Sequence, residues 1–117
     1  NFTLLLENEH VRVLEYVLLP GEQDQWHTHP PKVSYVLSGG KLEIHLDDGT
    51  SFLADEKTGT ADWAGVRGKH YVKNVGATPV RILLVEDKAA ADDRHRPGQV
   101  HRLPRRSSDS FLAHAAD

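Results

Sequence analysis

Two histidines, His27 and His29, are separated by one residue in the segment QWHTH, which is bounded by turn residues in the manner of a short β-strand. In a strand, side chains two positions apart point to the same face, about 7 Å apart at the backbone. Two imidazoles at this spacing can converge on one metal ion, and a third ligand must come from another strand. His70, in GKHYVKN, is the histidine best placed by pattern to supply it.

The residues around these histidines resemble the two motifs of the cupin superfamily. The first motif, G-x5-H-x-H-x(3,4)-E-x6-G, is matched by a glycine, both histidines and a glycine pair: Gly21, His27, His29 and Gly39-Gly40. The second, G-x5-P-x-G-x2-H-x3-N, is matched in part by Gly59, His70 and Asn74. The resemblance covers residues 7–87. It implies a small single-domain cupin, an all-β double-stranded β-helix (jelly-roll barrel), with His27, His29 and His70 as metal ligands.

The glutamate of the first motif is absent. Its position falls on Lys32, Val33 or Ser34, depending on the direction of counting, and no Asp or Glu occurs between Asp24 and Glu43. The resemblance therefore implies a site of three histidines without the carboxylate.

This loss has an electrostatic consequence. Three neutral imidazoles leave a divalent ion with its full charge and with open coordination positions, which favours an anionic, chelating ligand. With iron, the first expectation, substrate and dioxygen could bind together, as in a non-haem dioxygenase acting on a small anionic substrate. With zinc, nickel or manganese the site would polarise a carbonyl group, as in an isomerase or lyase. A non-catalytic ligand-binding or sensor module and a metal-free fold are further alternatives.

Three other residues could contact a substrate. Lys32 could hold an anionic group of the substrate, or act as an acid–base catalyst if burial lowers its pKa, although an ordinary loop lysine is the simpler interpretation. Strand parity places Gln25 and Ser34 on the inward face with the histidines, where they could orient a substrate or a metal-bound water. The same parity directs Tyr35 outward. Asn74 is interpreted as a turn or strand-end residue.

Short β segments must position these residues. Apolar and polar residues alternate, and turn residues recur every 8–12 positions with no helical period between them, which predicts an antiparallel sandwich or barrel. The expected strands are residues 11–19, 25–29, 33–38, 41–46, 50–55, 60–64, 70–75 and 80–86. Phe52 and Trp63 are expected in the core, and His45 on the surface.

Residues 1–87 are expected to form the barrel and residues 88–117 a polar tail. The tail contains Pro97 and Pro104 and a possible short helix over residues 107–116. We expect it to pack on the barrel or on a partner subunit. Exposed strand edges favour a homodimer, in which the first segment (NFTLLLE) or the tail could be exchanged.

Composition excludes several classes of function. The 117 residues suffice for one domain, and the absence of cysteine rules out disulfides and thiolate metal sites. Residues 1–87 carry 13 acidic against 8 basic side chains, which gives no electrostatic basis for nucleic-acid binding. No apolar run is long enough to cross a membrane, and no signal segment is evident, so we expect a cytoplasmic protein.

Overall fold

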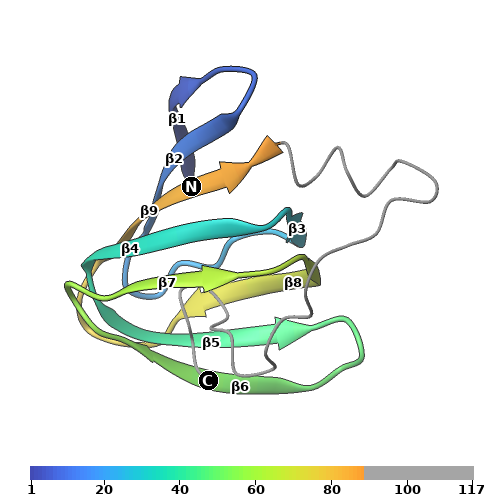
Figure 1. The fold of residues 1–117 in the computed structure, drawn as a ribbon. Helices are drawn as coiled ribbons and strands as arrows, with labels where there is room; N and C mark the ends of the chain where they lie inside the picture. Colours follow the sequence, from blue (N-terminus) through green and yellow to red (C-terminus); the bar gives the residue numbers. More distant parts are fainter. Residues whose placement is uncertain (89–117) are drawn as a thin grey trace.

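Nine β-strands make up most of residues 1–88, the part of the chain that the computed structural model describes (Figure 1). The strands are β1 (Phe2–Glu7), β2 (Val11–Leu18), β3 (His27–His29), β4 (Lys32–Ser38), β5 (Gly40–Leu46), β6 (Ser51–Glu56), β7 (Ala61–Ala64), β8 (Arg67–Asn74) and β9 (Val80–Asp87). The predicted all-β class is confirmed. Residues 1–88 contain no helix with the length and apolarity that crossing a membrane requires.

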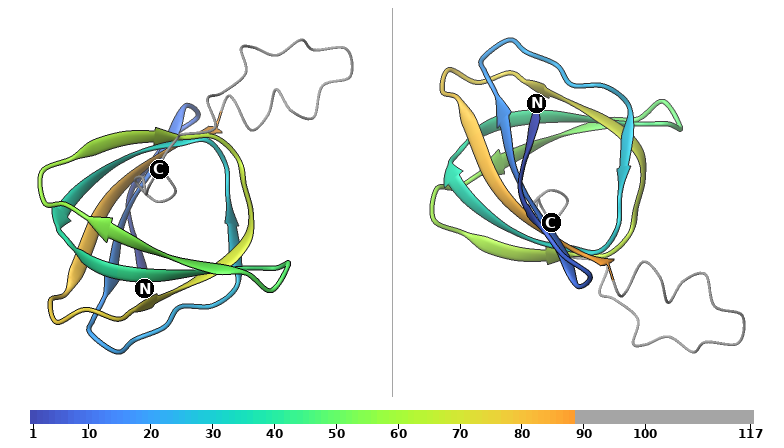
Figure 2. Two further views of the ribbon diagram at one scale, coloured as in Figure 1. Left: turned by 90° about the horizontal axis from the view of Figure 1, so that it is seen from below. Right: turned by 90° about the horizontal axis from the view of Figure 1, so that it is seen from above.

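The strands form two antiparallel sheets that curve around one interior (Figure 2). One sheet has the order β1-β2-β9-β4-β7 and the other the order β3-β8-β5-β6. The chain passes from the first sheet to the second between β4 and β5, at Gly39. A Cβ atom on Gly39 would lie 2.0 Å from the carbonyl oxygen of Glu56, so only glycine fits at this crossing. The arrangement is the jelly-roll barrel predicted from the sequence.

The interior of the barrel is apolar at one end and polar at the other. Val36 on β4 pairs with Ile82 on β9 at the apolar end, and Lys32 pairs with Glu86 at the polar end. The apolar core is formed by Leu14, Tyr16, Leu18, Val36, Leu42, Ile44, Ala54, Val72, Val80, Ile82 and Leu84. Burial of each large aliphatic side chain contributes about 1.5–3 kcal/mol. This core fixes the separation of the sheets and therefore of the polar groups that follow along the same strands.

The first strand, β1, was not among the expected strands. It pairs with β2 at the edge of the five-stranded sheet, with Phe2 opposite Tyr16, and the β1–β2 hairpin projects at the top of Figure 1. All six of its residues are exposed. Its sequence, FTLLLE, lacks the alternation that marks a strand buried on one face, which explains the omission.

Strand boundaries differ most from prediction at the starts of β3 and β8, and β8 begins at Arg67 rather than at residue 70. Residues 25–29 were expected to form one strand, but β3 contains only His27–His29, and the preceding segment contributes an isolated bridge from Gln23 to Lys73. The predicted tail, including its helix, lies outside the described residues apart from Lys88. The Lys88 ammonium donates a hydrogen bond to the Glu7 carboxylate at 2.8 Å.

Four side chains outside the histidine cluster test predictions of orientation or burial. Tyr35 points outward as predicted, and His45 lies partly exposed on the outer face of the four-stranded sheet. Trp63 was expected in the core but is only half-buried and does not belong to the apolar core. Phe52 was expected in the core but is 36% exposed, because β6 lies at the edge of its sheet and has a neighbour on one side only.

Candidate metal centre

The three histidines singled out in the sequence come together inside the barrel. His27 on β3 is paired directly with His70 on β8, and a bulge after His27 places His29 opposite Arg67. One ligand atom from each imidazole lies within 4.8 Å of the other two. Ring centroids are 4.3 Å apart for His27 and His70, 4.8 Å for His27 and His29, and 5.3 Å for His29 and His70. The predicted convergence of His27, His29 and His70 is therefore present.

Each imidazole turns its Nδ1 atom toward an oxygen. The Nδ1 of His27 lies 2.6 Å from the carbonyl oxygen of Gln25, and that of His70 lies 2.8 Å from the carbonyl oxygen of Gly68. A carbonyl oxygen only accepts, so both Nδ1 atoms carry the proton, and each Nε2 presents its lone pair. This is the tautomer that binds a metal through Nε2.

His29 shows how well the cluster fits a metal. Its Nδ1 lies 3.6 Å from Oε2 of Glu86, and only 4% of the residue is exposed. Its Nε2 is buried and makes no hydrogen bond with any described residue. A buried nitrogen without a partner is costly, and a metal ion at the centre of the three rings would satisfy it. The donor set therefore fits a divalent transition metal.

Burial keeps two of these histidines neutral. Burial, together with the smaller effect of the Lys32 charge, lowers the pKa of His29 to about 4 and that of His70 to about 3. At neutral pH both rings are unprotonated at Nε2. The lone pairs needed for metal binding are therefore available without competition from a proton.

A buried carboxylate, Glu86, lies on the Nδ1 side of the His29 ring, away from Nε2. The Arg12 guanidinium contacts Oε1 of Glu86 through Nε at 2.9 Å and through Nη2 at 2.7 Å. Burial opposes ionisation of Glu86, but its contacts with His29 and Arg12 outweigh this effect and lower its pKa. Glu86 therefore stays ionised and can hold His29 in its tautomer. Sequence reasoning missed this residue, although alternation in VRILLVED places Glu86 inward.

A second buried carboxylate, Asp24, braces the segment that leads into β3. Its Oδ2 accepts a hydrogen bond from the Tyr16 hydroxyl at 2.6 Å, and its Oδ1 accepts one from the Val72 amide at 2.7 Å. Oδ1 also lies 3.9 Å from Nδ1 of His27. Burial raises the pKa of Asp24, while these hydrogen bonds oppose the rise. This role for Asp24 was not predicted from the sequence, where it appears only as the residue that precedes a stretch without acidic residues.

Lys32 lies at the polar end of the barrel and is completely buried. It belongs to β4, so the simple interpretation as a loop lysine is wrong. Burial and, to a smaller extent, the Arg67 charge lower the pKa of Lys32 to about 7. The carboxylates of Glu56, Glu86 and Asp62 oppose this shift. Lys32 pairs across the sheet with Glu86, whose Oε2 lies 3.6 Å from Nδ1 of His29, so Lys32 lies near the cluster.

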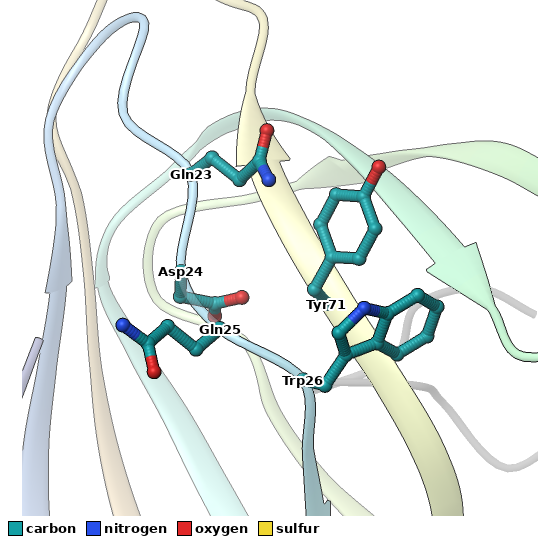
Figure 3. A pocket seen from close by; sticks show the side chains of 5 residues that line it. All are labelled: Gln23, Asp24, Gln25, Trp26 and Tyr71. Carbon is teal, nitrogen blue, oxygen red and sulfur yellow. The ribbon is translucent and has the colours of Figure 1, made fainter.

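The other two expected contact residues have different positions. Ser34 is buried on the inward face of β4, as parity predicted. Gln25 is exposed rather than buried with the histidines, and it is one of five residues that line a second pocket (Figure 3). Residues 24–26 are not in a strand, and the two-residue alternation does not apply to them. Asn74 ends β8 and bonds to Leu18, Gly76 and Thr78, as expected of a strand-end residue.

An aromatic residue of β1 closes one side of the histidine cluster. The Phe2 ring centroid lies 5.5 Å from that of His27, 6.0 Å from that of His29 and 4.8 Å from that of Tyr16. Together with Val72, Ile82 and Leu84, these side chains line a narrow hollow beside the cluster. One flank of the site is therefore apolar, and the Lys32 flank is charged.

Known structures resemble this chain, although no family model and no curated protein matches it. A cupin-domain protein from Bordetella pertussis is 26% identical with a TM-score of 0.69, and the match covers 75% of this chain and 92% of that one. An RmlC-like cupin from Methanocaldococcus jannaschii, described as a double-stranded β-helix, is 19% identical with a TM-score of 0.62 and coverage of 79% and 83%. A predicted oxalate decarboxylase from Thermotoga maritima is 24% identical with a TM-score of 0.53 and coverage of 74% and 77%.

Proposed function

We propose that this chain, whose fold is the double-stranded β-helix of the cupins, binds one divalent transition metal through Nε2 of His27, His29 and His70 and is a metalloenzyme. The observation that carries the proposal is the buried Nε2 of His29, which has no hydrogen-bond partner among the described residues. The oriented Nδ1 atoms of His27 and His70 support it.

The reaction we propose first is dioxygenation of a small anionic, chelating substrate. Bound iron would supply open coordination positions and redox chemistry, whereas zinc, nickel or manganese would act as a Lewis acid. No carboxylate belongs to the three-histidine cluster. The imidazoles bring no negative charge to offset that of the ion, so a substrate oxyanion is favoured as the additional ligand.

The chain's own charges favour the same class of substrate. Lys32 approaches the cluster from the five-stranded sheet, opposite the strands that carry the histidines. Glu86 is engaged by Arg12 on Oε1 and faces His29 with Oε2. An anionic group bound between the metal position and Lys32 would therefore meet positive potential from two sides, while Phe2 and Val72 line the apolar flank.

An isomerase or lyase is the second candidate, favoured by the protonation behaviour of Lys32. With a pKa of about 7, Lys32 is present in both the ammonium and the amine form at neutral pH. Such a group can donate or accept a proton in a reaction that does not consume oxygen.

Oxygen consumption distinguishes the two candidates. Protein stripped of metal and reloaded with iron or with zinc would be supplied with 2-oxo acids, β-dicarbonyl compounds and catechols in an oxygen electrode. A dioxygenase consumes oxygen with iron and not with zinc. Turnover of a substrate without oxygen consumption would favour the isomerase or lyase. Saturable binding without turnover of any compound would contradict both and favour a ligand-binding protein.

A further inference from the structure

A second pocket lies on the outer side of the four-stranded sheet, where the segment before β3 runs beside β8 (Figure 3). Its volume is about 320 Å³, and it is lined by Gln23, Asp24, Gln25, Trp26 and Tyr71. Tyr71 faces outward because its neighbours His70 and Val72 point into the barrel. Pockets for small molecules begin at about 300 Å³, so this one has room for a single small ring.

The aromatic wall of this pocket is rigid. The Trp26 ring packs edge-to-face with Tyr71 at a centroid distance of 4.8 Å, and Tyr71 stacks on His45 at 4.4 Å with an angle of 3° between the planes. Nε2 of His45 is held by the Glu43 carboxylate at 2.9 Å. Trp26 is nevertheless 49% exposed. A fixed and accessible indole provides contact area with little loss of conformational entropy on binding.

The polar groups of the pocket are neutral amides. In Figure 3 the Gln23 amide turns toward the Tyr71 side, and Gln25 extends to the side away from the two rings. Within residues 1–88, no hydrogen bond engages the side chain of either glutamine. An amide can donate and accept, and so matches a hydroxyl group, which also does both.

The single ionisable carboxylate lining the pocket, Asp24, is already engaged. Both of its oxygens accept hydrogen bonds, one from Tyr16 and one from the Val72 amide. The pocket therefore offers no unengaged carboxylate to attract a cation and no lining ammonium or guanidinium to attract an anion. A neutral ligand with hydroxyl groups and one apolar face fits these features.

We propose that this outer pocket binds the ring of a neutral saccharide. The C–H face of a pyranose lies on the exposed indole of Trp26, because the electron-rich face of an aromatic ring attracts C–H groups. Its hydroxyls exchange hydrogen bonds with the amide of Gln23, which lies on the same side as the two rings. The two rings of the site lie on the opposite side of the sheet from the histidine cluster.

The test uses three methyl glycosides, those of glucose, galactose and mannose, as probes of the full chain. The chain has two tryptophans, Trp26 and Trp63, whose indole N–H signals can be followed separately by NMR. At least one glycoside should shift the Trp26 signal saturably at millimolar concentration and leave Trp63, on the other sheet, unchanged. No saturable shift with any of the three, or equal shifts at both tryptophans, would overturn the proposal.

Variants assign the binding to the individual groups. By calorimetry, Trp26→Ala should weaken binding at least about tenfold, and Gln23→Ala about fivefold. Tyr35→Ala is the matched control, because it removes another exposed aromatic ring from the other sheet. Cyclohexanol has a similar ring with one hydroxyl and should bind much more weakly than the best glycoside. Equal affinity for cyclohexanol, or unchanged affinity in Trp26→Ala, would contradict the proposal.

Discussion

Lys32 and Glu86 are direct partners across β4 and β9, at the polar end of the barrel, where both side chains are buried. Glu86 also faces His29 with Oε2, while Arg12 holds its Oε1. One carboxylate thus links a histidine of the proposed metal centre to a buried cation and to a half-exposed guanidinium. The predictions below separate what each partner contributes.

Replacing Lys32 with methionine should leave the metal in place and weaken the binding of anions. The cobalt-substituted protein would be titrated with oxalate, a small chelating dianion, and followed by its visible spectrum. We expect Lys32→Met to raise the Kd at least about tenfold, equivalent to about 1.4 kcal/mol. Lys41→Met, which removes an exposed lysine, is the control. Loss of metal from Lys32→Met, or an unchanged Kd, would contradict the role of Lys32 in binding the substrate.

Replacing Glu86 with glutamine should weaken metal binding while the three histidines remain. Groups that orient a metal-ligating histidine contribute about 10–100-fold to metal affinity. Zinc affinity measured by competition with a chelator should fall within this range. Glu15→Gln, which breaks an exposed ion pair with Arg81, should leave it unchanged. Equal zinc affinity in Glu86→Gln and the native protein would show that Glu86 does not position His29.

The metal-free protein should lose stability as the pH falls below about 6.5. The pKa values of His29 and His70 are lowered from 6.5 to about 4 and about 3 in the folded state, so the unfolded chain takes up protons first. The free energy of unfolding should therefore decrease steadily between pH 6.5 and about 4. Urea unfolding at intervals across this range measures the slope.

The variant His70→Ala isolates one of these two groups. In this variant the free energy of unfolding should depend less steeply on pH, by the equivalent of about one proton. The reason is that the unfolded chain then has one fewer histidine to protonate. His10→Ala, at an exposed position, should leave the slope unchanged. Identical slopes in His70→Ala and the native protein would contradict the inference that burial lowers the pKa of His70.

Replacing Tyr16 with phenylalanine should destabilise the fold. The change removes the 2.6 Å hydrogen bond to Asp24 and leaves a buried carboxylate with less support, at a cost of about 1–3 kcal/mol. Urea unfolding at neutral pH measures the loss. Tyr35→Phe alters an outward-facing tyrosine and should change the stability by less than about 0.5 kcal/mol. Equal effects of the two changes would contradict the role of Asp24 as a buried brace.

The position of the histidine cluster could be predicted because it depends on local rules. The two-residue period places His27 and His29 on one face, and His70 follows from the motif spacing. The same period does not apply to Gln25, because the chain is irregular before β3. The expected strand began at residue 33 and so left out Lys32, which is the first residue of β4 and is buried between β7 and β9.

The hydrogen bonds and ion pairs that hold the histidine cluster in place could not be predicted from the spacing of residues in the sequence. Arg12 and Glu86 are separated by 74 residues and Asp24 and the Val72 amide by 48, and the register of distant strands decides whether they meet. Alternation along β9 could have placed Glu86 on the inward face, but it could not have shown that His29 is its neighbour. The approach of Phe2 to the histidines depends on β1, a strand without a clear pattern.

Metal content tests the central claim most directly. Untagged native protein, His70→Ala and His10→Ala would be purified without chelators, and their metal would be measured by elemental analysis before and after incubation with iron, zinc, nickel and manganese. We predict close to one equivalent of metal in the native protein and in His10→Ala, and a large loss in His70→Ala. Absence of metal from the native protein under every condition, or equal content in His70→Ala, would contradict the three-histidine metal centre.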